Sequence, residues 1–129
     1  MHTILVVDDS PTIRRMVRAA LGGLPDVAFL EAGSGLEAIE TLAVNPVHAL
    51  VLDLNMPDMH GLDALRFLRS HDQYRELPVL ILTTRGDEAS RAAALKAGAS
   101  AYLTKPFSPE TLTSAVRDLL PSSLRSAQS

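Results

Sequence analysis

The chain has 129 residues, contains no cysteine and carries a net charge of −3 at pH 7. Its length predicts a single domain, and the absence of cysteine excludes disulfides, thiolate metal sites and a cysteine nucleophile. The acidic balance argues against non-specific nucleic-acid binding, which needs a basic surface. No apolar run reaches the length of a signal-peptide core or of a membrane helix, so we expect a cytoplasmic protein without membrane insertion.

Short aliphatic runs alternate with helical patterns along the chain. The predicted strands are Thr3–Val7, Ala28–Ala32, Leu50–Leu54, Val79–Thr83 and Ala101–Thr104. The predicted helices are Pro11–Leu21, Leu36–Val44, Leu62–Leu68, Asp87–Ala97 and a last helix from Ser108 or Pro109 to Leu120. The third and fourth strands are almost wholly apolar, which is typical of a parallel sheet covered on both faces. The pattern predicts an α/β, doubly wound parallel sheet over residues 1–120, followed by a polar tail or linker remnant over 121–129.

The first predicted helix has a start signal and a charged face. Ser10 is suited to cap its first turn, and Pro11 suits the first helical position. Arginines occupy the side of the helix opposite to its apolar stripe, at Arg14, Arg15 and Arg18. We expect this side to be solvated, as charged helix faces usually are.

Ionisable and hydroxyl side chains follow four of the predicted strands. Asp8 and Asp9 follow the first strand, Asp53 lies in the third, Thr83 ends the fourth and Lys105 follows the fifth. Because ligands bind beyond the carboxyl ends of parallel strands, we expect these side chains to meet at one edge of the sheet. Three carboxylates with a single lysine leave negative charge uncompensated, which favours a hard divalent cation such as Mg²⁺.

Each of these residues taken alone also has an ordinary structural explanation. The Asp8–Asp9 pair could cap the following helix, Thr83 suits a strand, and Lys105 could be a loop lysine. An aspartate beside a buried strand is less ordinary, because an unpaired buried carboxylate is costly. The functional hypothesis therefore depends on the combination of three acids, a hydroxyl and a lysine.

At these residues the sequence closely resembles the receiver domain of two-component response regulators, the family of the bacterial chemotaxis regulator. The matching segments are VVDDS at Val6–Ser10, VLDLNMPDMHG at Val51–Gly61, LILTT at Leu80–Thr84 and AGASAYLTKPF at Ala97–Phe107. The resemblance covers about residues 3–120 in the family's order and spacing. It implies a flavodoxin-like (βα)5 fold with strand order 2-1-3-4-5, and a cis peptide bond between Lys105 and Pro106.

The resemblance also implies roles at the acidic edge. Asp53 would be the phosphoacceptor, receiving a phosphoryl group from a histidine kinase or a histidine phosphotransfer protein. Mg²⁺ would bind Asp9 directly, Asp8 largely through water, the Asp53 carboxylate and the backbone carbonyl of Asn55. The kinase or phosphotransfer protein would supply the phosphate, which agrees with the absence of a nucleotide-binding glycine motif.

The remaining roles that the resemblance implies concern the switch. Lys105 would pair with Asp53 and then with the phosphoryl oxygens, Thr83 would hydrogen-bond the phosphoryl group, and Tyr102 would rotate inward behind it. Without the resemblance, Tyr102 is more simply a half-buried strand aromatic, on the face opposite to Ala101 and Leu103. The fourth and fifth strand–helix units would then change surface and control binding of a downstream protein that the sequence does not name.

We expect a signalling switch that slowly hydrolyses its own acyl phosphate, and not a turnover enzyme. It would be a monomer, with phosphorylation-dependent dimerisation as an alternative, and it could be a receiver excised from a longer regulator. An aspartate-nucleophile phosphohydrolase is a second hypothesis, but those enzymes favour a second aspartate where this chain has Asn55. A degenerate docking module that works without phosphorylation is a third, against which the complete acidic, threonine and lysine set argues.

Overall fold

Alternating strands and helices run through the part of the chain that the computed structural model describes, residues 2–56 and 58–120. The strands are β1 His2–Val7, β2 Val27–Ala32, β3 Ala49–Leu52, β4 Val79–Thr83 and β5 Ala101–Thr104. The helices are α1 Pro11–Leu21, α2 Gly35–Val44, α3 Gly61–Ser70, α4 Glu88–Lys96 and α5 Pro109–Leu119. All ten predicted elements are present, although β3 ends at Leu52, two residues before its predicted end. The predicted tail over 121–129 lies outside the described residues.

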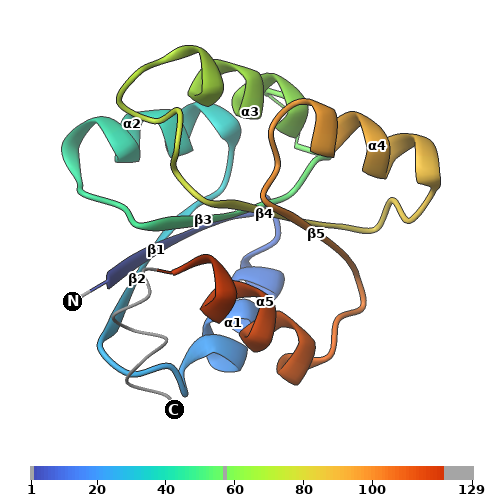
Figure 1. The fold of residues 1–129 in the computed structure, drawn as a ribbon. Coiled ribbons are helices and arrows are strands. Elements are labelled where there is room, and N and C mark those ends of the chain that lie inside the picture. Colours follow the sequence, from blue (N-terminus) through green and yellow to red (C-terminus); the bar gives the residue numbers. More distant parts are fainter. Residues whose placement is uncertain (1, 57, 121–129) are drawn as a thin grey trace.

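The strands form one parallel sheet in the order β2-β1-β3-β4-β5, which confirms the predicted 2-1-3-4-5 topology. In this sheet Leu50 of β3 pairs with Leu5 of β1 on one side and with Val79 of β4 on the other. Helices α2, α3 and α4 cover one face, and α1 and α5 cover the other (Figure 1). The predicted doubly wound arrangement with helices on both faces is therefore confirmed.

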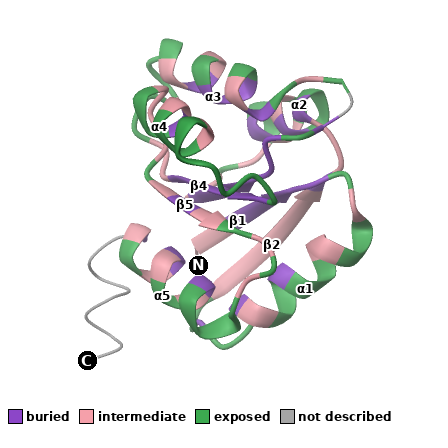
Figure 2. Ribbon diagram, turned by 90° about the vertical axis from the view of Figure 1, so that its right-hand side faces the viewer, coloured by how far each residue is buried: buried purple, intermediate pink, exposed green. Residues whose placement is uncertain are grey.

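The sheet separates two apolar layers. Alternate residues of β1 point to opposite faces, so Leu5 packs towards α2–α4 while Ile4 packs towards α1 and α5. β3 and β4 are buried along their whole length, as their apolar sequences predict (Figure 2). Fixed on both faces, the strands form a rigid base for the loops at their carboxyl ends.

Helix starts follow the local sequence signals. Ser10 caps α1 by accepting a hydrogen bond from the backbone N–H of Ile13 at 3.2 Å, and Pro11 occupies the first helical position. His60 caps α3 with its Nδ1 atom, which accepts from the N–H of Leu62 at 3.1 Å. Among residues 2–56 and 58–120, no helix combines the length and apolar character needed to cross a membrane.

Candidate functional site

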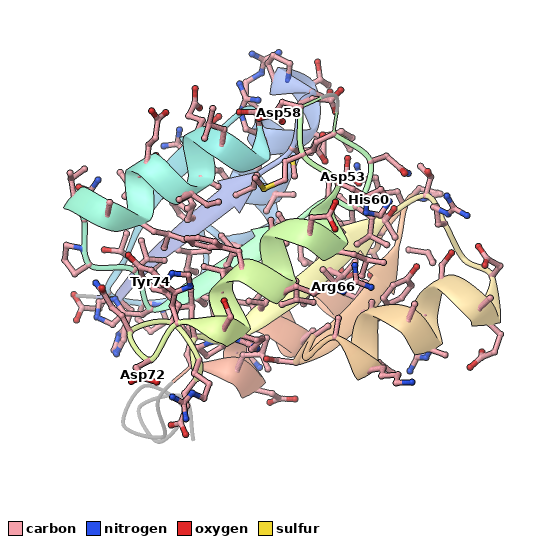
Figure 3. All side chains as sticks on the ribbon, turned by 90° about the horizontal axis from the view of Figure 1, so that it is seen from above. Asp53, Asp58, His60, Arg66, Asp72 and Tyr74 are labelled. Atoms are coloured by element: carbon pink, nitrogen blue, oxygen red, sulfur yellow. The ribbon has the colours of Figure 1, made fainter. Side chains whose placement is uncertain are left out.

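Three carboxylates converge at the carboxyl edge of the sheet. Asp8 and Asp9 follow β1, and Asp53 follows β3, the neighbouring strand in the sheet. Each of these residues offers a carboxylate oxygen, and the three oxygens lie within 4.8 Å of one another. The side chains of Asp8 and Asp53 are buried, whereas Asp9 is exposed. Figure 3 shows Asp53 at the start of the loop that leads to α3.

Lys105 supplies positive charge to this cluster from the end of β5. Its Nζ atom lies 2.6 Å from an Asp8 oxygen and 3.7 Å from an Asp53 oxygen. The resemblance implied pairing with Asp53, but in this structure the shorter contact is to Asp8. The ammonium group therefore bridges two carboxylates. Its peptide bond to Pro106 is cis, as the resemblance implied.

The environment of Asp53 raises the pKa of its carboxyl above the ordinary value of 3.8. Burial is the largest cause, because it disfavours the charged form, and the negative charges of Asp8 and Asp9 act in the same direction. The Lys105 charge and the backbone N–H of Asn55 oppose this effect by stabilising the carboxylate. Because the net shift of the pKa is upward, the surrounding groups only partly compensate the negative charge of Asp53.

The cluster suits a hard divalent cation. Carboxylate oxygens are the ligands that Mg²⁺ prefers, and it usually takes one or two of them together with water and phosphate oxygens. Asp8, Asp9 and Asp53 supply this donor type on a partly open edge, since Asp9 faces solvent. One lysine against three acids leaves net negative charge that such a cation would neutralise. The donor set therefore fits magnesium.

Thr83 of β4 and Tyr102 of β5 face the α2–α4 side of the sheet. Tyr102 packs there with Ile81, and Thr83 lies two residues after Ile81 in the same strand. Thr83 ends β4 and is fully buried, and its hydroxyl oxygen accepts a hydrogen bond from the backbone N–H of Arg85 at 3.4 Å. Tyr102 is 6% exposed, and its hydroxyl donates to the carbonyl oxygen of Arg85. Ala101 packs on the opposite face, as predicted. Tyr102 is thus in an inward position, and both side chains bond to the backbone of the same residue.

Two further residues that shape this edge, Asp58 and Arg14, were not predicted to do so. Asp58, on the loop after β3, accepts hydrogen bonds from two backbone N–H groups at the start of α2, and Gly61 packs against the backbone at Asp53.

Arg14 was expected on a solvated helix face, but its side chain is only 17% exposed. That prediction is wrong for Arg14 and holds for Arg15, which is exposed. Helical periodicity locates the Cα of an arginine, but it does not show where so long a side chain ends.

Comparison with protein families and sequences gives consistent results. A family model described as the response regulator receiver domain matches residues 4–117. The chemotaxis protein CheY1 of Helicobacter pylori is 44% identical over 110 residues, which cover 84% of this chain and 89% of that protein. The response regulator MprA of Mycobacterium ulcerans is also 44% identical, over 117 residues that cover 91% of this chain but 49% of that longer protein.

Comparison with solved structures supports the same fold. A putative response regulator from Chloroflexus aurantiacus matches with a TM-score of 0.86 at 36% identity, over 92% of this chain and 96% of that one. The chemotaxis response regulator CheY4 of Vibrio cholerae matches with a TM-score of 0.85 at 33% identity, over 93% of this chain and 99% of that one. The likeness therefore extends over almost the whole of each of these chains.

Proposed function

This chain belongs to the response regulator receiver family, and we propose that its Asp53 carboxylate accepts a phosphoryl group from the phosphohistidine of a histidine kinase or histidine phosphotransfer protein. Receiver domains are signalling proteins, and phosphorylation on aspartate and Mg²⁺ binding are general features of the family. The single observation that carries the assignment to Asp53 is the convergence of its buried carboxylate with Asp8, Asp9 and Lys105.

We assign the magnesium ion to the carboxylates of Asp8, Asp9 and Asp53, with the backbone carbonyl of Asn55 as a further ligand. When bound, Mg²⁺ would neutralise charge on the transferred group and on the carboxylates around it. The fit rests on the oxygen donors and on the excess of negative charge at this edge. The downstream partner is a protein whose binding depends on the phosphorylation state, and the oligomeric state we propose is a monomer.

The residues of this chain provide a nucleophile and its electrostatic surroundings. Asp53 is the nucleophile, because an ionised carboxylate can attack phosphorus in line with the leaving imidazole. Phosphoryl transfer requires little covalent work from a protein beyond positioning and charge stabilisation. Lys105 is placed for this task, since its ammonium lies 3.7 Å from an Asp53 oxygen and can stay close to the phosphoryl oxygens that arrive there.

We propose that Thr83 and Tyr102 report the phosphorylated state to the surface. A phosphoryl group on Asp53 adds acceptor oxygens, to which the Thr83 hydroxyl can donate. The inward position of Tyr102 and its bond to the Arg85 carbonyl link this site to the loop that leads into α4. Phosphorylation would thereby bias an existing equilibrium between conformations of β4, α4 and β5.

The proposal is tested by labelling with a small phosphodonor. Incubation with acetyl phosphate and Mg²⁺ should add one phosphate to the intact protein, measured by mass spectrometry, and Asp53→Asn should abolish the addition. Asp63→Asn is the matched control, because Asp63 is an exposed acid on α3 outside the cluster, and it should be labelled like the wild type. An unchanged wild-type mass, or hydrolysis of simple phosphomonoesters, would contradict the proposal.

A further inference from the structure

Arg14 of α1 connects the acidic edge to β2. Its Nε atom donates to the Glu31 carboxylate at 2.8 Å, and its Nη1 atom donates to the backbone carbonyl oxygen of Asp8 at 2.5 Å. The side chain is 17% exposed, so these bonds form in a partly dehydrated environment, where they are stronger than at the surface. One guanidinium group thus joins Glu31 on β2 to the main chain at the end of the neighbouring strand β1.

The carbonyl that Arg14 binds lies in the peptide unit between the two acidic residues that follow β1. The other polar groups of Asp8 have their own partners. Its N–H donates to the Ala32 carbonyl, one carboxylate oxygen accepts from the Ser10 N–H, and the other accepts from Lys105. The Arg14 contact therefore acts directly on the carbonyl of the peptide plane that leads to Asp9.

Glu31 holds the Arg14 side chain in this position. The two oxygens of its carboxylate accept from different arginines, Oε1 from Arg14 and Oε2 from Arg18 at 2.6 Å. These two bonds lower the pKa of Glu31, so it stays ionised and able to hold both guanidinium groups at neutral pH. Arg18 is more exposed, and its guanidinium carbon lies 5.6 Å from the centre of the Phe29 ring. It shares the Glu31 anchor with Arg14 but, within residues 2–56 and 58–120, makes no hydrogen bond to Asp8 or Asp9.

We propose that Arg14 is a positioning residue for magnesium, and that its fork between Glu31 and the Asp8 carbonyl sets the orientation of the Asp8–Asp9 peptide that the ion requires. The proposal rests on the assignment of Mg²⁺ to Asp8 and Asp9 given above. Groups that hold the ligands of a metal ion commonly change its affinity by about 10–100-fold when they are removed. Arg14 would act in this way through the main chain, without touching the ion.

The direction in which the Mg²⁺ affinity changes when Arg14 is replaced distinguishes a positioning role from simple charge repulsion. Arg14 is a cation near a cation site, so removal of its charge alone should strengthen Mg²⁺ binding. Loss of the peptide orientation should instead weaken it. A purely structural role predicts a third result, in which the melting temperature falls while the Mg²⁺ affinity of the folded protein stays the same.

The test is Mg²⁺ binding to the unphosphorylated protein, measured by isothermal titration calorimetry and repeated with Mn²⁺ by water-proton relaxation. Arg14→Ala should weaken binding about tenfold. Arg14→Lys should also weaken it, because one ammonium keeps the charge but lacks the planar fork that spans both acceptors. Arg18→Ala is the matched control: it removes the same charge and the same Glu31 contact type, and it should bind at least as tightly as the wild type.

Glu31→Gln gives an independent measurement if the Arg14 variants fold poorly. It retains an acceptor oxygen but loses the charge that holds Arg14, and it should weaken Mg²⁺ binding by a smaller factor in the same direction. Wild-type affinity in Arg14→Lys, or equal losses in Arg14→Ala and Arg18→Ala, would overturn the positioning role. A wild-type protein that does not bind Mg²⁺ would instead contradict the proposed function itself.

Discussion

At the scale of single residues, the charge on Asp53 has a cost for the folded state. Asp53 is 5% exposed, its carboxyl lies beside two other acids, and burial raises its pKa above 3.8. Lys105 does not remove this cost, because its shorter ion pair is with Asp8. The Asp53 carboxylate therefore lies in an environment that favours a compensating cation or a proton, which is common for groups at functional sites.

We predict that Asp53→Asn stabilises the protein at neutral pH without Mg²⁺. Because the pKa is raised in the folded state, the favourable contribution of protonated Asp53 is present below the unfolded-state pKa and is lost as pH rises through the folded-state value. The melting temperature of Asp53→Asn should exceed that of the wild type by roughly 2–5 °C at pH 7, the shift expected for about 1 kcal/mol in a domain of this size.

Scanning calorimetry at several pH values checks this prediction. The difference between Asp53→Asn and the wild type should shrink as the pH falls, and added Mg²⁺ should raise the melting temperature of the wild type more than that of the variant. The exposed acid Asp63 provides the comparison, since Asp63→Asn should leave the melting temperature nearly unchanged. A destabilised Asp53→Asn protein at pH 7 would show that the carboxylate is well compensated after all.

At the scale of elements, the loop between β3 and α3 is held by two different helices. Where α3 begins, Gly61 donates its N–H to the Leu54 carbonyl at 2.8 Å, and a Cβ atom there would lie 2.7 Å from the Leu54 Cα atom. At the other side, the Asp58 carboxylate accepts from the N–H groups of Gly35 at 3.2 Å and Leu36 at 3.1 Å (Figure 3). The loop that follows Asp53 is thereby tied to the starts of α3 and α2.

We predict that Asp58→Ala loosens the start of α2 together with the loop between β3 and α3. Helix-terminal N–H groups and a carboxylate attract one another, so the variant should lose hydrogen-exchange protection at Gly35 and Leu36. These same bonds lower the pKa of Asp58 below 3.8. A lowered pKa means that the stabilisation is present above the unfolded-state pKa and is lost as pH falls through the folded-state value.

Amide exchange measured by NMR at neutral and acidic pH tests this tie between loop and helix. Asp58→Asn keeps one acceptor oxygen, so its amide protection at Gly35 and Leu36 should lie between that of Asp58→Ala and that of the wild type. Wild-type amides at the start of α2 should lose protection only when the pH drops below the ordinary aspartate range. Unchanged exchange at Gly35 in Asp58→Ala would mean that the Asp58 carboxylate does not hold the start of α2.

At the scale of the whole molecule, the sequence predicts the order of strands and helices better than it predicts which side chains form hydrogen bonds and ion pairs. The parallel sheet follows from apolar runs such as β4 and from the alternation of strands and helices. Any parallel sheet with this strand order brings Asp8 and Asp53 to one edge, whatever the side-chain conformations. The inward bend of Arg14 and the division of Lys105 between two acids depend on side-chain torsions, which periodicity does not describe. Asp58 lies in a loop, where neither a helical nor a strand period applies.

The division of the molecule by its sheet makes a prediction about the switch. Thr83 and Tyr102 both face the α2–α4 layer, and the Tyr102 hydroxyl is bonded to the loop before α4. On the other face, α5 is tied to α1 by the Thr113 hydroxyl, which donates to the Ala20 carbonyl at 2.9 Å. A rearrangement that begins at Thr83 should therefore spread into α4 and β5 and leave the α1–α5 contact intact.

We predict that phosphorylation with acetyl phosphate and Mg²⁺ changes amide exchange in α4 and β5 by about fivefold or more, the lower end of usual coupling between sites, with little change at the α1–α5 contact. Thr83→Ala should still accept phosphate on Asp53, because its hydroxyl is not the nucleophile, yet the exchange response of α4 should be lost. Thr113→Ala removes a hydroxyl from the opposite layer and should retain the full response. Equal changes in both layers, or a normal response in Thr83→Ala, would show that the signal leaves the site by another route.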